Sequence, residues 1–293
     1  MIQHDEKSLQ RGALFAFAAY GSWGLLPLFW KLLSSVESTQ ILSCRVVFSL
    51  VFVWFILALR GKARWWTLLL NMQNLKALAL SALFISLNWG LYIWAVNSAH
   101  TVEASLGYYI NPLVNVLLGL LFFRERLSPL QWGAVALAAS GVLLMTIFSG
   151  VFPWISLALA LSFGLYGYAK KKIDLTSLEG LASETLLLAP LAIGFLLFRQ
   201  SHGNGAFSGG SIQITLLVSS GVITALPLLW FARAAKLLPL STLGFIQFLS
   251  PTLQLALGVL VFGEAFPTRN IIAFAFVWAG VLLYSVSYIR RKV

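Results

Sequence analysis

Two ionisable residues stand inside long apolar segments, where a charge is costly. Arg45 follows Ile41 to Cys44, and Glu184 precedes Thr185 to Ala189. A charge at the centre of a bilayer costs at least about 2.5 to 3.5 kcal/mol, but a long arginine escapes much of this by snorkelling. Glutamate is shorter, so Glu184 is the better candidate for a carboxylate that takes up protons. We expect each residue about one turn inside its helix, Arg45 toward the outer face of the membrane and Glu184 toward the inner face. The two should not pair with each other, and each should bias one gate.

Other polar and aromatic side chains are interleaved in neighbouring apolar segments. These candidates for a substrate cavity are Asn88, Trp89, Tyr92, Tyr108, Asn111, Asn115, Gln247, Ser250 and Gln254. Buried amides facing lipid would be costly, so they should face other helices or water. One interpretation is hydrogen bonding between helices. As a group, they also suit a cavity for an amphiphilic or aromatic solute, which needs apolar walls and a few orienting polar groups.

Prolines and glutamates mark candidate kinks or gates. Pro112 and Pro251 fall in mid-segment, where a proline removes a backbone donor and kinks a helix; a static kink that improves packing is the alternative. Glu125 and Glu264 end the same segments, where an acid opposes the helix dipole. We expect a partner cation, or backbone donors of a neighbouring helix end, to hold each glutamate as a latch or a gate hinge.

Motifs for enzymes and nucleotide hydrolysis are missing from the sequence. It contains neither G-x-x-x-x-G-K-[ST] nor H-E-x-x-H, and its single cysteine, Cys44, offers no metal cluster. The aspartates, Asp5 and Asp174, lie outside the apolar segments, so they cannot form an intramembrane pair. We therefore predict no catalytic residues, no metal, no cofactor and no ATP-driven step.

The composition indicates a membrane protein. Hydrophobic residues make up 59% of the chain and charged residues 10%, with a mean hydropathy of +0.88, whereas roughly a quarter of a soluble chain is charged. The net charge of +11 would suggest nucleic acid in a soluble protein. Here the basic residues lie in short gaps between apolar segments, as in cytoplasmic loops. The expected partner is the lipid bilayer, not nucleic acid.

Ten segments approach the roughly 20 apolar residues that span a hydrocarbon core. They are Gly12–Leu33, Ile41–Leu59, Leu75–Val96, Val102–Phe123, Pro129–Phe148, Val151–Ala169, Leu181–Phe198, Ile212–Ala232, Leu240–Phe262 and Phe266–Ile289. With a cytoplasmic N-terminus, 16 Lys and Arg fall inside and 3 outside, with Arg45 within a span. This bias places both termini in the cytoplasm.

The second half of the chain repeats the first. Pro112, Gly119, Glu125 and Gly141 recur 139 residues later as Pro251, Gly258, Glu264 and Gly280. Five helices per repeat is an odd number, so the two repeats must be inverted, a construction that supports alternating access. We predict an all-α membrane protein with ten transmembrane helices in two inverted five-helix repeats, residues 12–148 and 151–289, flanked by a cytoplasmic N-terminus, 1–11, and a basic tail, 290–293.

The repeated frame resembles the EamA-type repeat of the drug/metabolite transporter superfamily. The stretches from Asn88 to Val96 and from Glu103 to Leu113 are similar to the RarD group within it. The resemblance covers nearly the whole chain and implies a ten-helix bundle in the bacterial inner membrane, with a central cavity between the repeats. It implies no particular substrate. One departure from the repeat is that Glu184 stands 139 residues after the basic Arg45.

We interpret the chain as a secondary transporter, and specifically as an exporter of small amphiphilic metabolites or drugs. Protons are the candidate coupling ion, and the sequence sets no oligomeric state. The alternative is a membrane-embedded sensor or accessory subunit of the same fold without transport activity. The segment Ser201–Ser211 is too short and too rich in Gly and Ser for a separate binding domain, which argues against a receptor.

Overall fold

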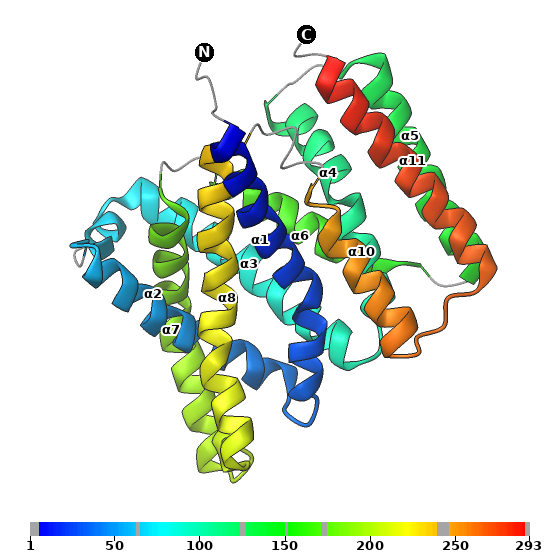
Figure 1. Ribbon diagram of the computed structural model, residues 1–293. Helices are drawn as coiled ribbons and strands as arrows, with labels where there is room; N and C mark the ends of the chain where they lie inside the picture. The colour runs from blue at the N-terminus through cyan, green and yellow to red at the C-terminus, as the bar shows by residue number, and fades with distance from the viewer. Residues whose placement is uncertain are drawn as a thin grey trace.

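The computed structural model describes residues 6–62, 65–123, 127–149, 152–170, 175–238 and 246–290, and every regular element in these ranges is helical (Figure 1). The long helices are α1 (Glu6–Leu32), α2 (Ser38–Leu59), α3 (Met72–Asn97), α4 (Thr101–Phe123), α5 (Pro129–Ser149), α6 (Trp154–Lys170), α7 (Ser177–Ser201), α8 (Ser211–Leu237) and α11 (Thr268–Arg290). Shorter elements are η1 (Trp65–Leu70), η2 (Ala206–Ser208), α10 (Leu249–Ala256) and η3 (Leu257–Val261).

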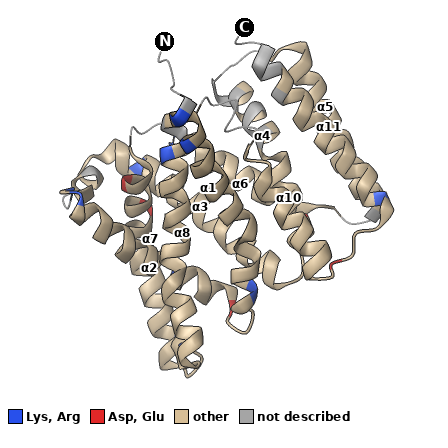
Figure 2. Ribbon diagram, viewed as in Figure 1, with Lys and Arg blue, Asp and Glu red and all other residues tan. Residues whose placement is uncertain are grey.

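The helices have the length and surface expected in a membrane. Among the described residues, six helices are long and apolar enough to cross a bilayer: α1, α2, α3, α5, α7 and α8. Large apolar side chains face outward, including Leu191 at 75% and Leu260 at 81% exposure. Most charged residues lie at or near helix ends (Figure 2). Because a bilayer satisfies no backbone polar groups, an all-helical chain with an apolar surface is the expected solution.

Contacts between helices come in matching sets across the two halves of the chain. Helix α1 packs against α8 and α10, and its counterpart α6 packs against α3 and α4. The counterparts α2 and α7 pack against each other, as do α5 and α11. The start of α1 and the end of α11 lie at the same end of the bundle (Figure 1).

The α5–α11 pair depends on two glycines at equivalent repeat positions. A Cβ atom on Gly141 of α5 would lie 2.7 Å from the carbonyl oxygen of Ala273 in α11. A Cβ atom on Gly280 of α11 would lie 2.7 Å from the carbonyl oxygen of Ala134 in α5. Each helix therefore presents a glycine to the backbone of the other, which permits the close approach typical of membrane helices.

The ninth predicted span differs most from the expectation. Leu240–Phe262 was expected to be one helix kinked at Pro251. In its described part, Ile246 is helical, a turn follows at Gln247 and Phe248, and α10 then runs from Leu249 into a π-helical turn, η3, at Leu257. Pro251 is thus the third residue of α10. The first four N–H groups of a helix have no intrahelical acceptor, so a proline there costs no hydrogen bond.

The structure also places other prolines and helix boundaries. The helices that contain Pro27, Pro112 and Pro227 continue on both sides of these positions, as membrane helices can when neighbouring helices stabilise the freed backbone groups. The kink at Pro112 stays a prediction. Helix α1 begins at Glu6, six residues before the predicted Gly12. Within the Ser201–Ser211 segment, Ala206–Ser208 form the short helix η2.

Candidate functional site

Arg45 lies in the interior of the bundle against two indole rings. Its side chain is 5% exposed, and its guanidinium carbon is 3.9 Å from the ring centroid of Trp89 in α3 and 5.1 Å from that of Trp30 in α1. Such cation–π contacts stabilise a desolvated cation by up to about 2 kcal/mol. Tyr92 and Tyr108 are also close enough to interact with it electrostatically. We call Arg45, Trp30, Trp89, Tyr92 and Tyr108 the Arg45 group.

Asn88 connects the Arg45 group to helix α6. Its amide nitrogen donates to the carbonyl of Leu159 and to the hydroxyl of Ser162, both at 3.0 Å, and its amide oxygen accepts from Tyr108 at 3.3 Å. The Tyr108 ring in turn packs edge-on against Tyr92, with centroids 5.5 Å apart. Asn88 therefore joins α3, α4 and α6 by hydrogen bonds, which is the simpler of the two roles expected for a buried amide.

The predicted cavity residues of the second half form a separate cluster. Gln254 of α10 donates to the backbone oxygen of Trp23 in α1 and to the hydroxyl of Ser250, both at 3.2 Å. Gln247 is partly buried just before α10. In the described part of the chain, no hydrogen bond or ion pair joins Gln254 or Ser250 directly to the Arg45 group. Helix α4 touches both, because Tyr108 belongs to the Arg45 group while Tyr109 bonds Thr252 of α10 at 2.6 Å.

Two further candidates lie on the same part of α4. Asn111 is partly buried, and its amide oxygen has no hydrogen-bond partner in the described part of the chain. The side chains of Asn115 and Pro112 lie outside what the structure describes. Sequence reasoning missed the Tyr109–Thr252 bond; the only available signal was two hydroxyl-bearing residues on segments at equivalent repeat positions.

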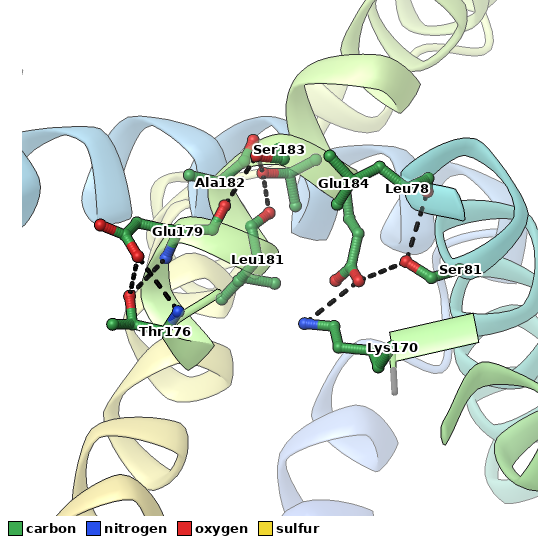
Figure 3. Close-up of polar contacts among 10 residues, drawn as sticks. Leu78, Ser81, Lys170, Thr176, Glu179, Leu181, Ala182, Ser183 and Glu184 are labelled. Atoms are coloured by element: carbon green, nitrogen blue, oxygen red, sulfur yellow. Dashed lines mark hydrogen bonds and ion pairs between the residues drawn. The ribbon is translucent and has the colours of Figure 1, made fainter. Parts of the chain in front are cut away.

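Glu184 pairs with Lys170, the residue directly after the predicted span Val151–Ala169. The carboxylate is 1% exposed; it accepts a hydrogen bond from Ser81 of α3 at 2.6 Å and lies 3.2 Å from the Lys170 ammonium at the end of α6 (Figure 3). The lysine reaches it over Gly180 of α7, where a Cβ atom would collide with the ammonium. Three helices thus meet at one buried carboxylate.

Arg45 and Glu184 lie deeper than predicted. Each is the eighth residue of its helix, in α2 and α7 respectively, and so about two turns from the start. Helix α7 begins at Ser177 because Thr176 and Glu179 form a capping box, in which each side chain bonds the backbone of the other (Figure 3). In the described part of the chain, no hydrogen bond or ion pair joins Arg45 to Glu184.

Ion pairs fasten α2 to α7 at both ends. Near one end, Lys62 lies 2.7 Å from Glu179; near the other, Arg199 lies 2.7 Å from Glu37. The Thr39 hydroxyl and, to a smaller degree, the Arg199 guanidinium hold the pKa of Glu37 below its ordinary value. Exposed ion pairs contribute little stability, typically below about 1 kcal/mol. The main effect of these two pairs is therefore on how α2 and α7 are aligned along their lengths.

Glu264 binds the start of α4. Its two carboxylate oxygens accept the backbone N–H groups of Thr101 and Val102, both at 2.8 Å. A helix N-terminus favours a carboxylate through its free N–H groups and its dipole. These are the backbone donors that a latch requires. The equivalent Glu125 lies outside the described residues.

Comparisons with known proteins were made against families, curated proteins and solved structures. The EamA-like transporter family matches residues 10–147. "Protein RarD" of Streptomyces exfoliatus is 46% identical, with 97% of this chain and 91% of that protein covered. "Uncharacterized transporter YojE" of Bacillus subtilis is 43% identical (99% and 98%), and "Protein RarD" of Escherichia coli K12 is 40% identical (98% and 99%).

A solved crystal structure is similar in fold. It aligns with a TM-score of 0.62 and 21% identity, covering 96% of this chain and 99% of that one. At this identity, the likeness concerns the fold alone.

Proposed function

The chain belongs to the RarD group of the EamA-like transporter family, and from this premise we propose that it is a secondary transporter that exports small amphiphilic metabolites or drugs. The family and the apolar helices identify the chain as a multi-pass bacterial membrane protein of a transporter family. Export, the use of a gradient and the class of solute are the proposed parts.

The proposed architecture is ten transmembrane helices in two inverted five-helix repeats, with both termini in the cytoplasm. The matching contact sets and the reciprocal glycines of α5 and α11 support it. The shared end of the bundle for the start of α1 and the end of α11 supports an even number of crossings (Figure 1). Two halves of this kind can exchange conformations about a site between them, as alternating access requires.

The observation that carries transport is the Arg45 group. A buried cation without a carboxylate partner is expensive to maintain, and in the described part of the chain no ion pair involves Arg45. Ion-pathway and solute-binding positions are where membrane proteins retain such residues. In a sensor or accessory subunit that had lost transport, no function would require an unpaired buried arginine.

Glu184 is the proposed site of proton coupling. In the structure its carboxylate joins α7 to α6 through Lys170 and to α3 through Ser81. Protonation removes the negative charge and with it the attraction to Lys170, so α6 and α7 become free to move apart. Proton uptake at this carboxylate would then be linked to opening of one side of the bundle.

The test has two stages. Untargeted metabolite comparison of cells that lack and cells that overexpress the protein should identify solutes whose distribution across the membrane changes. Purified protein in proteoliposomes should then move those solutes without ATP and faster under an imposed gradient. If expression shifts no solute and the reconstituted protein moves none of the candidates, the sensor or accessory role is the better description.

A further inference from the structure

The polar atoms around Arg45 that lack hydrogen-bond partners are mainly donors. In the described part of the chain, Nε and Nη1 of Arg45, the indole N–H of Trp30 and the hydroxyl of Tyr92 have no partner, and all are buried. Arginine and tryptophan can only donate, and a tyrosine hydroxyl can do so. Buried polar groups are normally hydrogen-bonded. What these groups have in common is the need for an acceptor with several lone pairs.

We propose that the Arg45 group binds the carboxylate of a small monoanionic solute whose aromatic or branched apolar body packs among the surrounding rings. This inference deepens the proposed function, on which it rests, by naming a substrate class for the same site.

Geometry favours a carboxylate. The guanidinium is a planar fork of donors that matches the two oxygens of a carboxylate or phosphate. Arg45 is the only cation within cation–π distance of Trp30 and Trp89 in the described residues. One arginine neutralises one carboxylate, whereas a phosphate dianion would leave excess charge in the membrane interior, where an unpaired charge is costly.

The surroundings favour an apolar body on the same solute. Trp30 and Tyr92 belong to a buried apolar cluster with Leu26, Leu33 and Ile93, and Tyr108 packs against it. Tyr108 also contacts Phe163 of α6 edge-on, with centroids 6.3 Å apart. Apolar walls with a few orienting polar groups are the usual construction of a small-molecule site. A hydrated inorganic anion would gain nothing from these rings.

The closing experiment compares acids with their neutral amides. Protein in nanodiscs is titrated calorimetrically with phenylacetate and indole-3-acetate, and with phenylacetamide and indole-3-acetamide, which keep the shape but lose the charge. We expect at least about tenfold tighter binding of each acid, because truncating a charged hydrogen-bond partner leaves the arginine unpaired. Equal binding of acid and amide, or no binding of either acid, overturns the proposal.

Variants assign the discrimination to Arg45. Arg45→Gln should abolish the preference for acids, and Arg45→Lys should retain a smaller preference because it keeps the charge without the fork. The control is Arg233→Gln, since Arg233 of α8 also lies over a ring, Phe15 at 5.4 Å, but is exposed; its preference should be unchanged. If Arg45→Gln does not fold, the proposal is still tested by the comparison of acids with amides in the wild-type protein and by the smaller preference expected of Arg45→Lys.

Two further arms separate alternative sources of the anion. Nanodiscs of phosphatidylcholine alone and nanodiscs containing phosphatidylglycerol should give the same acid affinity; competition confined to the anionic lipid would assign the site to a lipid headgroup and reject a soluble acid. Failure of the transporter proposal looks different, because acids would bind Arg45 normally while proteoliposomes show no flux. Flux of a neutral solute, unaffected by Arg45→Gln, would reject only this inference.

Discussion

Glu264 and Thr101 are joined by a hydrogen bond of 2.8 Å from the Thr101 backbone N–H to the carboxylate, and Val102 donates to the second oxygen at the same distance. The two residues are 163 positions apart, so a side chain from the second half of the chain binds the start of a helix in the first half. Because the carboxylate faces the positive end of α4, the charge that is unfavourable at the end of its own segment becomes favourable here.

Removing this carboxylate should therefore lower stability. Glu264→Ala leaves two N–H groups without their acceptor, and we expect a loss of about 2 kcal/mol; Glu264→Gln, which keeps one acceptor, should lose less. The measurement is the apparent melting temperature in detergent. Unfolding is detected because a thiol-reactive dye labels Cys44, which is buried in the folded protein. Glu103→Gln serves as the control, since Glu103 pairs with His100 in a partly exposed position. A Glu264→Ala variant as stable as this control would reject the latch.

The α5–α11 crossing predicts a second loss of stability. Gly141→Ala and Gly280→Ala each place a methyl group 2.7 Å from a backbone oxygen, and such overpacking costs about 1 to 3 kcal/mol. Gly194→Ala in α7 meets nothing within 4 Å and should be neutral or stabilising, because alanine restricts the unfolded chain. Equal melting temperatures for all three variants would show that the close approach of α5 and α11 at these glycines does not contribute to stability.

The charge distribution predicts the topology. Reporters fused after Lys62, Lys172 or Lys292 should be active on the cytoplasmic side, and a reporter within Ser201–Ser211 on the opposite side. Alkaline phosphatase and a fluorescent protein, which are active on opposite sides, provide the paired readout. A periplasmic C-terminus would contradict the inverted repeats.

A central aqueous path predicts accessible positions on two helices. Single cysteines at Tyr108, Asn111 and Asn115 in the first repeat, and at Gln247, Ser250 and Gln254 in the second, should react with a small polar thiol reagent in a Cys44→Ala background. Transported solute should protect some of them. Cysteine at Ala104, which is fully buried in the apolar core, provides the unreactive control. If all six positions behave like Ala104, their side chains only join helices.

Proton coupling predicts a loss of pH dependence. Glu184→Gln cannot gain or lose a proton and lacks the attraction to Lys170, so transport in proteoliposomes should no longer respond to an imposed proton gradient while folding is retained. Glu179→Gln is the matched control on the same helix, because Glu179 also pairs with a lysine, Lys62, but near the surface; its pH response should persist. An unchanged pH response in Glu184→Gln would eliminate the coupling role.

Properties that depend on one segment at a time could be predicted from the sequence. Apolar length predicted helices that match most of the described boundaries to within a few residues, and the family was recognised from residues such as Asn111-Pro112. Both can be read from one segment without knowing which helices pack against it, because each membrane helix satisfies its own backbone hydrogen bonds. The capping box at Thr176 and Glu179 is equally local, and it determines where α7 begins and therefore how far along the helix Glu184 lies.

Partners were decided by the tertiary structure. Arg45 and Glu184 are equivalent by repeat position, yet Arg45 lies against two indoles and Glu184 against Lys170 and Ser81. Helices α2 and α7 are apolar on all sides, so hydropathy gives little indication of how each is rotated about its axis. That rotation determines which neighbours a side chain meets. The turn at Gln247 and Phe248 before α10 is of the same kind, because hydropathy does not mark it: Ile246 and Leu249 on either side of the turn are both apolar. The sequence thus identified the two ionisable residues that are costly to bury, and helix packing determined which neighbours stabilise each of them.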